Sequence, residues 1–303
     1  MIDIDELDEK FSIEGEVGFA ELEEELAFVT VSNKYADADI CLYGAHITSF
    51  RPQNNMDLLW LSPESSFEEG KAIRGGIPVC FPWFGPHKTD ADMPQHGFGR
   101  LMYWDVAATS TNPAGESVVT LQLCSSPQTK AYWPNDFCAE MTFVVGRTLT
   151  ATLKVTNTSR EPFEYTCALH SYYSLSGIEN IQIEGLKGIT YYNQLTGEFD
   201  IQEEENLTIQ DATTRHYLNT ESVVVIDDPL FRRRIKASKT GSKVTTVWNP
   251  WEETCAQIGD MPDEGYETFV CVEATNAFDY PIHLEPGESH ETTAIIGLEE
   301  QDA

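Results

Sequence analysis

The sequence predicts an all-β protein built from antiparallel sheets, and three observations support this fold class. Apolar and polar residues alternate with a period of two along several segments that are rich in β-branched residues. Amphipathic helices are almost absent, and Asn-Pro, Pro-Gly and Ser-Gly pairs interrupt the chain between these segments. We therefore expect one large antiparallel β-sandwich domain over residues 1–303, with the acidic residues 1–25 at its periphery; two stacked sandwiches are the alternative.

The clearest strand covers residues 148–156, where leucine, alanine and valine alternate with threonine and lysine. Residues 141–145 alternate in the same way, and Gly146 and Arg147 are placed to turn the chain between these two strands. Residues 117–123 and 292–298 are further predicted strands. Only residues 21–26 and 62–69 have a composition compatible with short helices.

The net charge of −31, from 19 basic and 50 acidic residues, limits the partners of this protein. Nucleic acids and anionic membranes both require a basic surface, so we expect the protein to bind neither. The first residues are acidic, and no apolar stretch is long enough to cross a bilayer. We expect a cytoplasmic protein whose acidity serves solubility, and a monomer, with an oligomer as the alternative. An anion could bind only in a local basic pocket, which makes the few arginines informative.

The seven cysteines are scattered, and most of them lie in apolar runs. This pattern favours buried, reduced thiols over a disulfide framework or a zinc site. The seven histidines do not form an HxH or HxxxH cluster, so the sequence gives no support to a metal-dependent isomerase. Arg232, Arg233 and Arg234, with Lys236 and Lys239, form a basic cluster, and strand alternation predicts that Arg234 and Lys236 lie on one solvated face.

Two loops place arginines beside glycines. Arg74 precedes Gly75 and Gly76, which permit backbone conformations that other residues resist and let a ligand approach the main chain. The run from Pro94 to Arg100 combines an imidazole with a guanidinium on a glycine-rich turn. Two guanidinium groups could bind a phosphate bidentately, although each loop taken alone is more often structural.

Two titratable residues end apolar runs. His170 follows Ala168 and Leu169, and Glu273 follows residues 269–272. A buried carboxylate is costly unless it is hydrogen-bonded or used in chemistry, and burial raises its pKa toward neutrality, where it can accept or donate protons. A strand-end glutamate satisfied by backbone amides is the structural alternative.

Several of these segments occur in one order and together resemble a known family, the glucose-6-phosphate 1-epimerase branch of the aldose 1-epimerases. The similarity covers the chain from about Val29 to Leu298, and it rests on motifs that are each of limited specificity. These motifs are Leu42-Tyr43-Gly44-Ala45-His46, Ile73-Arg74-Gly75-Gly76-Ile77-Pro78, Pro94-Gln95-His96-Gly97-Phe98-Gly99-Arg100, Leu169-His170-Ser171-Tyr172, Val247-Trp248-Asn249-Pro250-Trp251, Cys271-Val272-Glu273 and Leu284-Glu285-Pro286-Gly287-Glu288.

The resemblance implies a galactose-mutarotase-like β supersandwich and an acid–base mechanism without a metal or another cofactor. It implies that the substrate is a hexose 6-phosphate, with His170 as general acid and Glu273 as general base. His96 and Gln95 would contact the sugar, and Arg74 and Arg100 would bind the phosphate. We therefore expect His170 and Glu273 to face one another across a sugar-sized hollow, with the arginines at its rim.

One position departs from the family pattern. Thr214 stands where family members commonly carry an aspartate that binds sugar hydroxyls. Threonine can donate and accept a hydrogen bond but provides no charge, so substrate choice or efficiency is in question, and Asp211 is a nearby alternative. Two other functions are compatible with the sequence: a mutarotase of unphosphorylated aldoses, and a non-catalytic carbohydrate-binding protein of the same fold.

Overall fold

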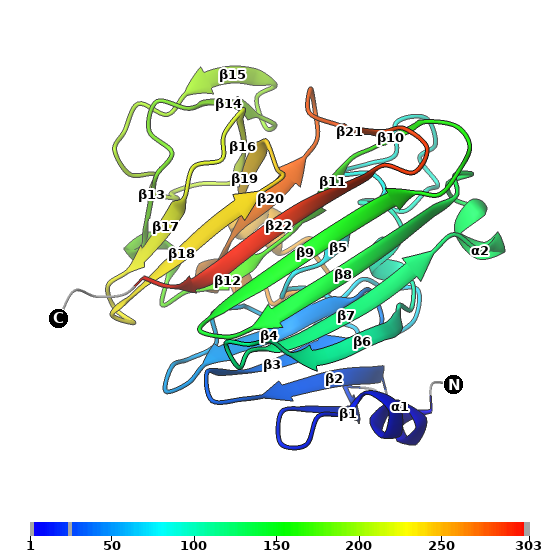
Figure 1. The fold of residues 1–303 in the computed structure, drawn as a ribbon. Coiled ribbons are helices and arrows are strands. Elements are labelled where there is room, and N and C mark those ends of the chain that lie inside the picture. The colour runs from blue at the N-terminus through cyan, green and yellow to red at the C-terminus, as the bar shows by residue number, and fades with distance from the viewer. Residues whose placement is uncertain (1–2, 24–25, 300–303) are drawn as a thin grey trace.

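The computed structural model describes residues 3–23 and 26–299 of the chain, and nearly all of its regular structure is antiparallel β-sheet (Figure 1). One eight-stranded sheet, which we call the β20 sheet, contains β15 (Glu198–Ile201), β14 (Thr190–Asn193), β16 (Thr213–Leu218), β19 (Val244–Asn249), β20 (Phe269–Asn276), β11 (Cys167–Leu169) and β5 (Val79–Cys80) in that order, with β12 (Tyr172–Ser174) also paired with β20.

The second eight-stranded sheet, the β9 sheet, runs in the order β13 (Gln182–Glu184), β17 (Val224–Asp228), β18 (Arg233–Thr240), β22 (Ser289–Leu298), β9 (Thr148–Asn157), β8 (Phe137–Val145), β7 (Ser117–Cys124) and β6 (Asp105–Thr111). A four-stranded sheet contains β1 (Val17–Leu22), β2 (Leu26–Ser32), β3 (Ala36–Cys41) and β4 (His46–Pro52), and a ribbon pairs β10 (Phe163–Tyr165) with β21 (Ile282–Leu284). The α-helices are short: α1 (Ile4–Phe11), α2 (Pro127–Lys130) and α3 (Trp251–Cys255).

The strands that alternation predicts are present, and this confirms the all-β fold class. β7, β8, β9 and β22 contain the four predicted segments, and Gly146 and Arg147 do connect β8 to β9. Burial follows the expected period of two, because every second residue of β8 from Phe137 to Val145 is buried. These strands are neighbours in the β9 sheet, in the order β22, β9, β8 and β7.

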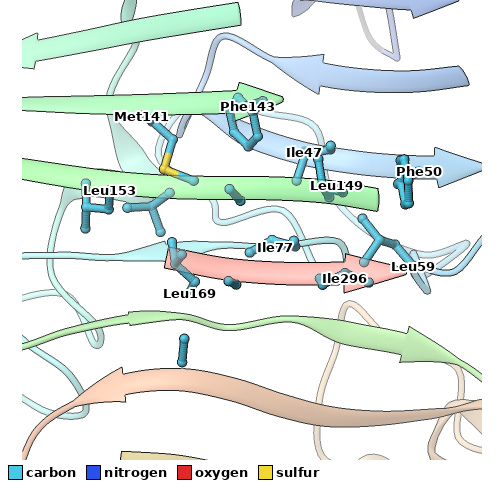
Figure 2. Packing of buried hydrophobic residues seen from close by; sticks show 14 of the residues in the cluster. Ile47, Phe50, Leu59, Ile77, Met141, Phe143, Leu149, Leu153, Leu169 and Ile296 are labelled. Carbon is cyan, nitrogen blue, oxygen red and sulfur yellow. The ribbon is translucent and has the colours of Figure 1, made fainter. Parts of the chain in front are cut away.

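The hydrophobic core lies between the sheets. Figure 2 shows Ile47 and Phe50 of β4, Met141 and Phe143 of β8, and Ile296 of β22 contributing to the same layer of buried side chains. The inward residues of β20 (Val270, Val272 and Ala274) belong to the same cluster, so the β20 sheet packs one of its faces against the β9 sheet. The opposite face of the β20 sheet is therefore left to carry polar side chains.

The helix predictions are wrong. Residues 21 and 22 end β1 and residue 26 begins β2, while residues 24 and 25 lie outside the described residues. Residues 62–69 form turns, and Ser62 is used there to donate a hydrogen bond to the carbonyl of Asp260 (2.7 Å). The helix that does form, α1, begins at an N-cap: the side chain of Asp3 accepts from the backbone N–H of Glu6 (3.2 Å). Within the expected peripheral segment, α1 has no buried residue, whereas β1 buries Val17 and Phe19.

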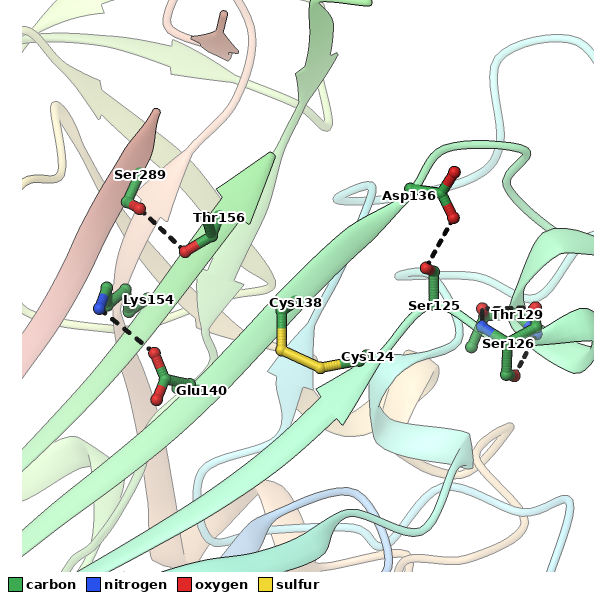
Figure 3. Close-up of a disulfide and its surroundings, with 10 residues drawn as sticks. All are labelled: Cys124, Ser125, Ser126, Thr129, Asp136, Cys138, Glu140, Lys154, Thr156 and Ser289. Carbon is green, nitrogen blue, oxygen red and sulfur yellow. Dashed lines mark hydrogen bonds and ion pairs between the residues drawn. A yellow bond between two sulfur atoms is a disulfide. The ribbon is translucent and has the colours of Figure 1, made fainter. Parts of the chain in front are cut away.

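The prediction that all cysteines are reduced is also wrong. Cys124 of β7 and Cys138 of β8 form a disulfide (Figure 3), and the two residues are directly opposite one another in the β7–β8 register. An in-register pair on adjacent antiparallel strands brings the two Cβ atoms within bonding reach of a disulfide. The other five cysteines are buried free thiols, as expected.

The basic cluster divides between the two faces of β18. Arg234 lies on the outer face and contacts acidic partners: Glu184 (2.9 Å), Asp227 (3.5 Å) and Glu299 (2.5 Å). This agrees with the predicted solvated face. Arg233 and Lys239 point inward instead and are buried.

No helix within residues 3–23 and 26–299 is both long and apolar enough to cross a membrane.

Candidate active site

The face of the β20 sheet that points away from the β9 sheet gathers residues from the motifs that the sequence singled out. Residues directly opposite one another in an antiparallel ladder lie on the same face of a sheet. Cys271 is opposite both Trp248 and Tyr172, Glu273 is opposite Thr246, and Trp248 is opposite Thr214. All of these residues therefore share one face, which we call the site face.

His170 lies on this face because the chain keeps its register with β20 from the end of β11 to the start of β12, although residues 170 and 171 belong to neither strand. Leu169 of β11 is opposite Ala274, and Tyr172 of β12 is opposite Cys271, so residue 170 is in register with Glu273. The backbone N–H of Val272 donates to the carbonyl of Ser171 (3.2 Å), and the N–H of His170 donates to the carbonyl of Pro78 (3.1 Å). The chain thus presents His170 and Glu273 side by side on adjacent strands.

The two side chains are in contact, with His170 Nε2 3.4 Å from Glu273 Oε1. Both are buried, at 8% and 2% exposure respectively. The family resemblance predicts that these two side chains converge, and they do, but they touch directly and no sugar-sized hollow separates them. Within the described chain, His170 Nδ1 and Glu273 Oε2 are buried and have no hydrogen-bond partner. Unpartnered polar atoms of this kind are costly, and they are typical of groups that a ligand completes.

Burial sets the protonation of this pair. Desolvation raises the pKa of Glu273 well above its usual range. The pKa of His170 lies well below its usual range, first because of desolvation and then because of His96, Arg100 and Arg74. The free pair is therefore stable with the carboxyl group protonated and the imidazole neutral.

The loop from Pro94 to Arg100 brings a second imidazole to this pair. The rings of His96 and His170 have centroids 5.8 Å apart. The backbone N–H of Gly85 donates to His96 Nδ1 (3.1 Å), so this nitrogen is unprotonated and the ring proton is on Nε2. His96 Nε2 lies 3.2 Å from Gln95 Nε2, so it can donate to this side-chain amide only when the amide oxygen is turned toward it; Gln95 is exposed. Desolvation, with the charges of Arg100 and Arg74, lowers the pKa of His96 to about 3.

Arg100 forms a hydrogen bond within the same loop. Its Nη2 donates to the carbonyl of Gln95 (2.9 Å), and its buried Nε has no partner among the described residues. The loop geometry depends on Gly97, which has a φ of +73°, because an added Cβ would lie 2.1 Å from the carbonyl oxygen of Phe81. Gln95, His96 and Arg100 are therefore held together by one tight turn.

Arg74 is connected to His170 through the side chain of Tyr172, which contacts both residues. Its Nε donates to Asp260 Oδ1 (3.0 Å), and its Nη1 donates to the hydroxyl of Tyr172 (3.3 Å). The ring of Tyr172 stacks on the imidazole of His170, with centroids 4.9 Å apart and an interplanar angle of 14°. The side chain of Arg74 is about a quarter exposed, so part of this side chain remains accessible to a ligand.

The glycines after Arg74 serve close backbone packing. Gly76 has a φ of +59°, and an added Cβ would lie 2.2 Å from the carbonyl oxygen of Ile47 and 2.8 Å from His46 Nε2. His46 is buried, and its Nε2 contacts the carbonyl of Gly75 (2.7 Å). The pair of glycines therefore lets the Arg74 segment lie against β4, with His46 as a structural partner.

Thr214 lies on the site face but farther from the pair. It is opposite Trp248, whose ring meets the imidazole of His170 edge-on with centroids 5.8 Å apart. Thr214 is partly exposed, which leaves its hydroxyl group available to a ligand beyond Trp248. Asp211 is exposed in the segment that precedes β16, outside the ladder.

The structure adds residues to which the sequence analysis gave no role. Tyr172, Asp260 and Trp248 contact His170 or Arg74 directly. For Tyr172 a signal existed, because a residue two positions after His170 along an extended strand lies on the same face. Asp260 comes from the segment between α3 and β20, and no local pattern indicates it. Among residues 3–23 and 26–299, no group of three or more His, Cys, Asp or Glu side chains is arranged to hold a metal ion.

The fold is that of galactose-mutarotase-like proteins. A galactose mutarotase-like protein from Lactobacillus casei has the same fold, with a TM-score of 0.73 at 17% sequence identity over 90% of this chain and 100% of that one. The sequence model of the family "Aldose 1-epimerase" matches residues 27–297, and the chain belongs to this family.

Two relatives are similar over most of their length. One, from Escherichia coli (strain K12), carries the name "Putative glucose-6-phosphate 1-epimerase" and is 36% identical over 255 residues, which cover 84% of each chain. The other is the crystal structure of YeaD from Salmonella typhimurium, described as "a putative mutarotase", with a TM-score of 0.89 and 32% identity over 96% of each chain.

Proposed function

We propose that this protein interconverts the α and β anomers of a hexose 6-phosphate, with Glu273 as the general base and His170 as the general acid. The observation that carries this proposal is the contact between His170 Nε2 and Glu273 Oε1 at 3.4 Å, on a face whose neighbouring polar atoms lack partners. Membership of the aldose 1-epimerase family and the name of the Escherichia coli relative support both the reaction and the phosphorylated substrate.

Anomerisation opens the sugar ring, rotates the chain about the C1–C2 bond and closes the ring on the other face. Opening requires removal of the proton from the C1 hydroxyl group and delivery of a proton to the ring oxygen. Both oxygens are bonded to C1, so an acid and a base that lie side by side can serve them together. Their roles reverse when the ring closes, and the pair returns to the protonation state in which it started the reaction.

The remaining residues bind the substrate in this proposal. Arg74 and Arg100 bind the 6-phosphate, His96 and Gln95 contact the sugar near His170, and Thr214 binds a hydroxyl group beyond Trp248. The accessible part of Arg74 and the unpartnered Nε of Arg100 support the phosphate assignment. Loss of one charge-assisted contact costs about 1.5–3 kcal/mol, which is roughly ten- to a hundredfold in kcat/KM.

The test is an anomer-exchange assay, by NMR, on wild type and on Glu273→Gln and His170→Ala. A positioned acid or base contributes about 10²–10⁴-fold, so each variant should lose at least about a hundredfold in kcat for glucose 6-phosphate. Full activity in either variant would remove that residue from the mechanism.

A mutarotase of unphosphorylated aldoses is the second candidate, because the family model alone does not specify a phosphate. Glucose, galactose, mannose and fructose, each with and without a 6-phosphate, separate the two functions. Equal kcat/KM for free and phosphorylated sugars would give the arginines another role. A complete lack of enzyme-dependent exchange would leave a carbohydrate-binding protein without activity.

A further inference from the structure

The proposed reaction needs a protonation state that the free site does not favour. A general base must be a carboxylate and a general acid must carry a proton, yet burial favours a protonated Glu273 and a neutral His170. The pair contains one proton in either arrangement. The question is therefore what moves this proton from the carboxyl oxygen to the imidazole when the substrate arrives.

The groups that surround His170 indicate an answer. Its neutral neighbours are the rings of Tyr172, Trp248 and His96, and the thiols of Cys80 and Cys271 lie near Glu273. The charged groups around the imidazole are two arginines, and the Asp260 carboxylate pairs with one of them. Arg74 is one side chain away, through the Tyr172 ring that stacks on the imidazole. Arg100 is connected through Gln95 and His96.

We propose that the substrate phosphate, by binding Arg74 and Arg100, drives the proton of the pair from Glu273 to His170 and so converts the pair to its reactive form. This inference rests on the proposed function and deepens it, because the phosphate becomes an activator of the acid–base pair. The O–H bond at Glu273 Oε1 breaks and an N–H bond at His170 Nε2 forms. No proton enters or leaves the protein in this step.

The phosphate can move this proton because the electrostatic potential at His170 is positive in the free site. Two guanidinium groups repel an additional positive charge on the imidazole, and a phosphate dianion between them cancels this repulsion. Neutralising one nearby charge in a partly desolvated site shifts a proton equilibrium by about one pKa unit, which is tenfold in population. A phosphate that only holds the sugar would lower KM and leave kcat unchanged.

Inorganic phosphite tests this idea on free glucose, because it provides the dianion without a bond to the sugar. Enzyme-dependent α–β exchange of glucose is measured with increasing phosphite at constant ionic strength, after subtraction of the exchange without enzyme. We expect phosphite to raise kcat for free glucose about tenfold or more, with saturation, and to move the alkaline limb of the pH profile to higher pH. Exchange that becomes detectable only with phosphite is the same result.

The inference is overturned if phosphite has no effect, if it only inhibits, or if free glucose is not turned over under either condition while glucose 6-phosphate is. It is also overturned if glucose and glucose 6-phosphate have the same kcat and differ only in KM. If neither sugar is turned over at all, the proposed function itself fails, so the two failures are distinguishable.

A matched pair of variants identifies the site of activation. Arg100→Ala should reduce the phosphite activation to less than about twofold, because one of the two phosphate contacts is lost. Arg51→Ala is the control, since Arg51 is exposed and pairs with Asp37 on the four-stranded sheet (2.8 Å), and the activation should be retained. Activation that survives in Arg100→Ala counts against the assignment. The phosphite titration of wild type decides the main question even if Arg100→Ala folds poorly.

Discussion

Glu273 and His170 are buried without full hydrogen bonding, and this arrangement has a cost in stability. The folded state keeps a proton on Glu273 above pH 4.5, whereas the unfolded chain releases it. The folded state therefore binds more protons than the unfolded state in this range, and the free energy of unfolding decreases as the pH rises. Residues that are used in chemistry often carry such a cost.

We predict that Glu273→Gln is more stable than wild type and that the difference increases from about pH 5 to pH 8. The glutamine has no proton to lose, so the variant lacks the decrease that burial of the carboxyl group imposes. The low pKa of His170 acts in the opposite direction below pH 6.5, but it is present in both proteins and largely cancels in the comparison. Urea unfolding at several pH values measures the difference. A difference that is constant or shrinks with pH contradicts the prediction.

At the scale of elements, the turn that carries His96 and Arg100 depends on the approach of its backbone to Phe81. Gly97 forms a bridge with Phe81, and the N–H of Gly99 donates to the carbonyl of Phe81 (2.9 Å). Aromatic residues pack against the turn. Phe98 lies near Tyr132 and Phe137, and Phe81 lies near Trp133. The disulfide between Cys124 and Cys138 closes the loop that contains Tyr132 and Trp133.

We predict that Gly97→Ala destabilises the protein by about 2 kcal/mol more than Gly188→Ala and also raises KM. Both glycines have positive φ, at +73° and +78°, so both variants share the conformational cost of alanine. Only at position 97 does the new Cβ meet backbone, and the turn must shift to relieve the contact. Urea unfolding and anomer exchange check the two effects, and equal costs for the two variants would argue against the backbone contact.

The elements also show how far the sequence could predict this structure. β7, β8 and β9 were predictable because they are long and half-buried, so that alternation is strong along eight to ten residues. β22 is equally long but buries consecutive residues, and it was predictable from its β-branched residues. β5, β11 and β12 have two or three residues each, and all of their residues except Ser174 are buried, so no alternation identifies them. These short strands position His170 and the Arg74 segment.

The errors have physical reasons of the same kind. The acidic residues at 21–26 resemble a helix locally, but Glu21 and Leu22 pair with the start of β2, and this pairing outweighs that weak propensity. Helix α1 had a readable signal in Asp3 and Glu6, with Ile4, Leu7 and Phe11 on one face. The disulfide required the register of two strands, which the spacing of the cysteines does not provide. The convergence of His170 and Glu273 was predicted from the family resemblance, and their direct contact was not.

For the whole molecule, the net charge of −31 opposes the approach of a phosphorylated substrate. Screening of this field depends on ionic strength, since the Debye length falls from about 30 Å at 0.01 M to about 8 Å at 0.15 M salt. The contacts to Arg74 and Arg100 act at much shorter range and are screened less. The extension of one core cluster from Val17 to Ile296 is consistent with a single domain, which stays a prediction.

We predict that kcat/KM for glucose 6-phosphate increases as potassium chloride is raised from about 0.01 M to about 0.15 M. Free glucose has no charge, so its kcat/KM should change little over the same range and provides the control. Initial rates at substrate concentrations well below KM measure both quantities. A decrease for glucose 6-phosphate with constant values for glucose would mean that local attraction by the arginines outweighs the field of the whole surface.

The in-register placement of His170 opposite Glu273 makes the proposed acid–base pair dependent on long-range assembly of the sheet. The two residues come from strands that are distant in sequence, and their ladder forms only after most of the chain has been synthesised. A slip of β20 by one position would turn the carboxyl group toward the hydrophobic interior, so a misregistered intermediate has no working site. Under the proposed mechanism, activity therefore reports the correct pairing of these strands, and a fragment that ends before β20 lacks Glu273, the proposed general base.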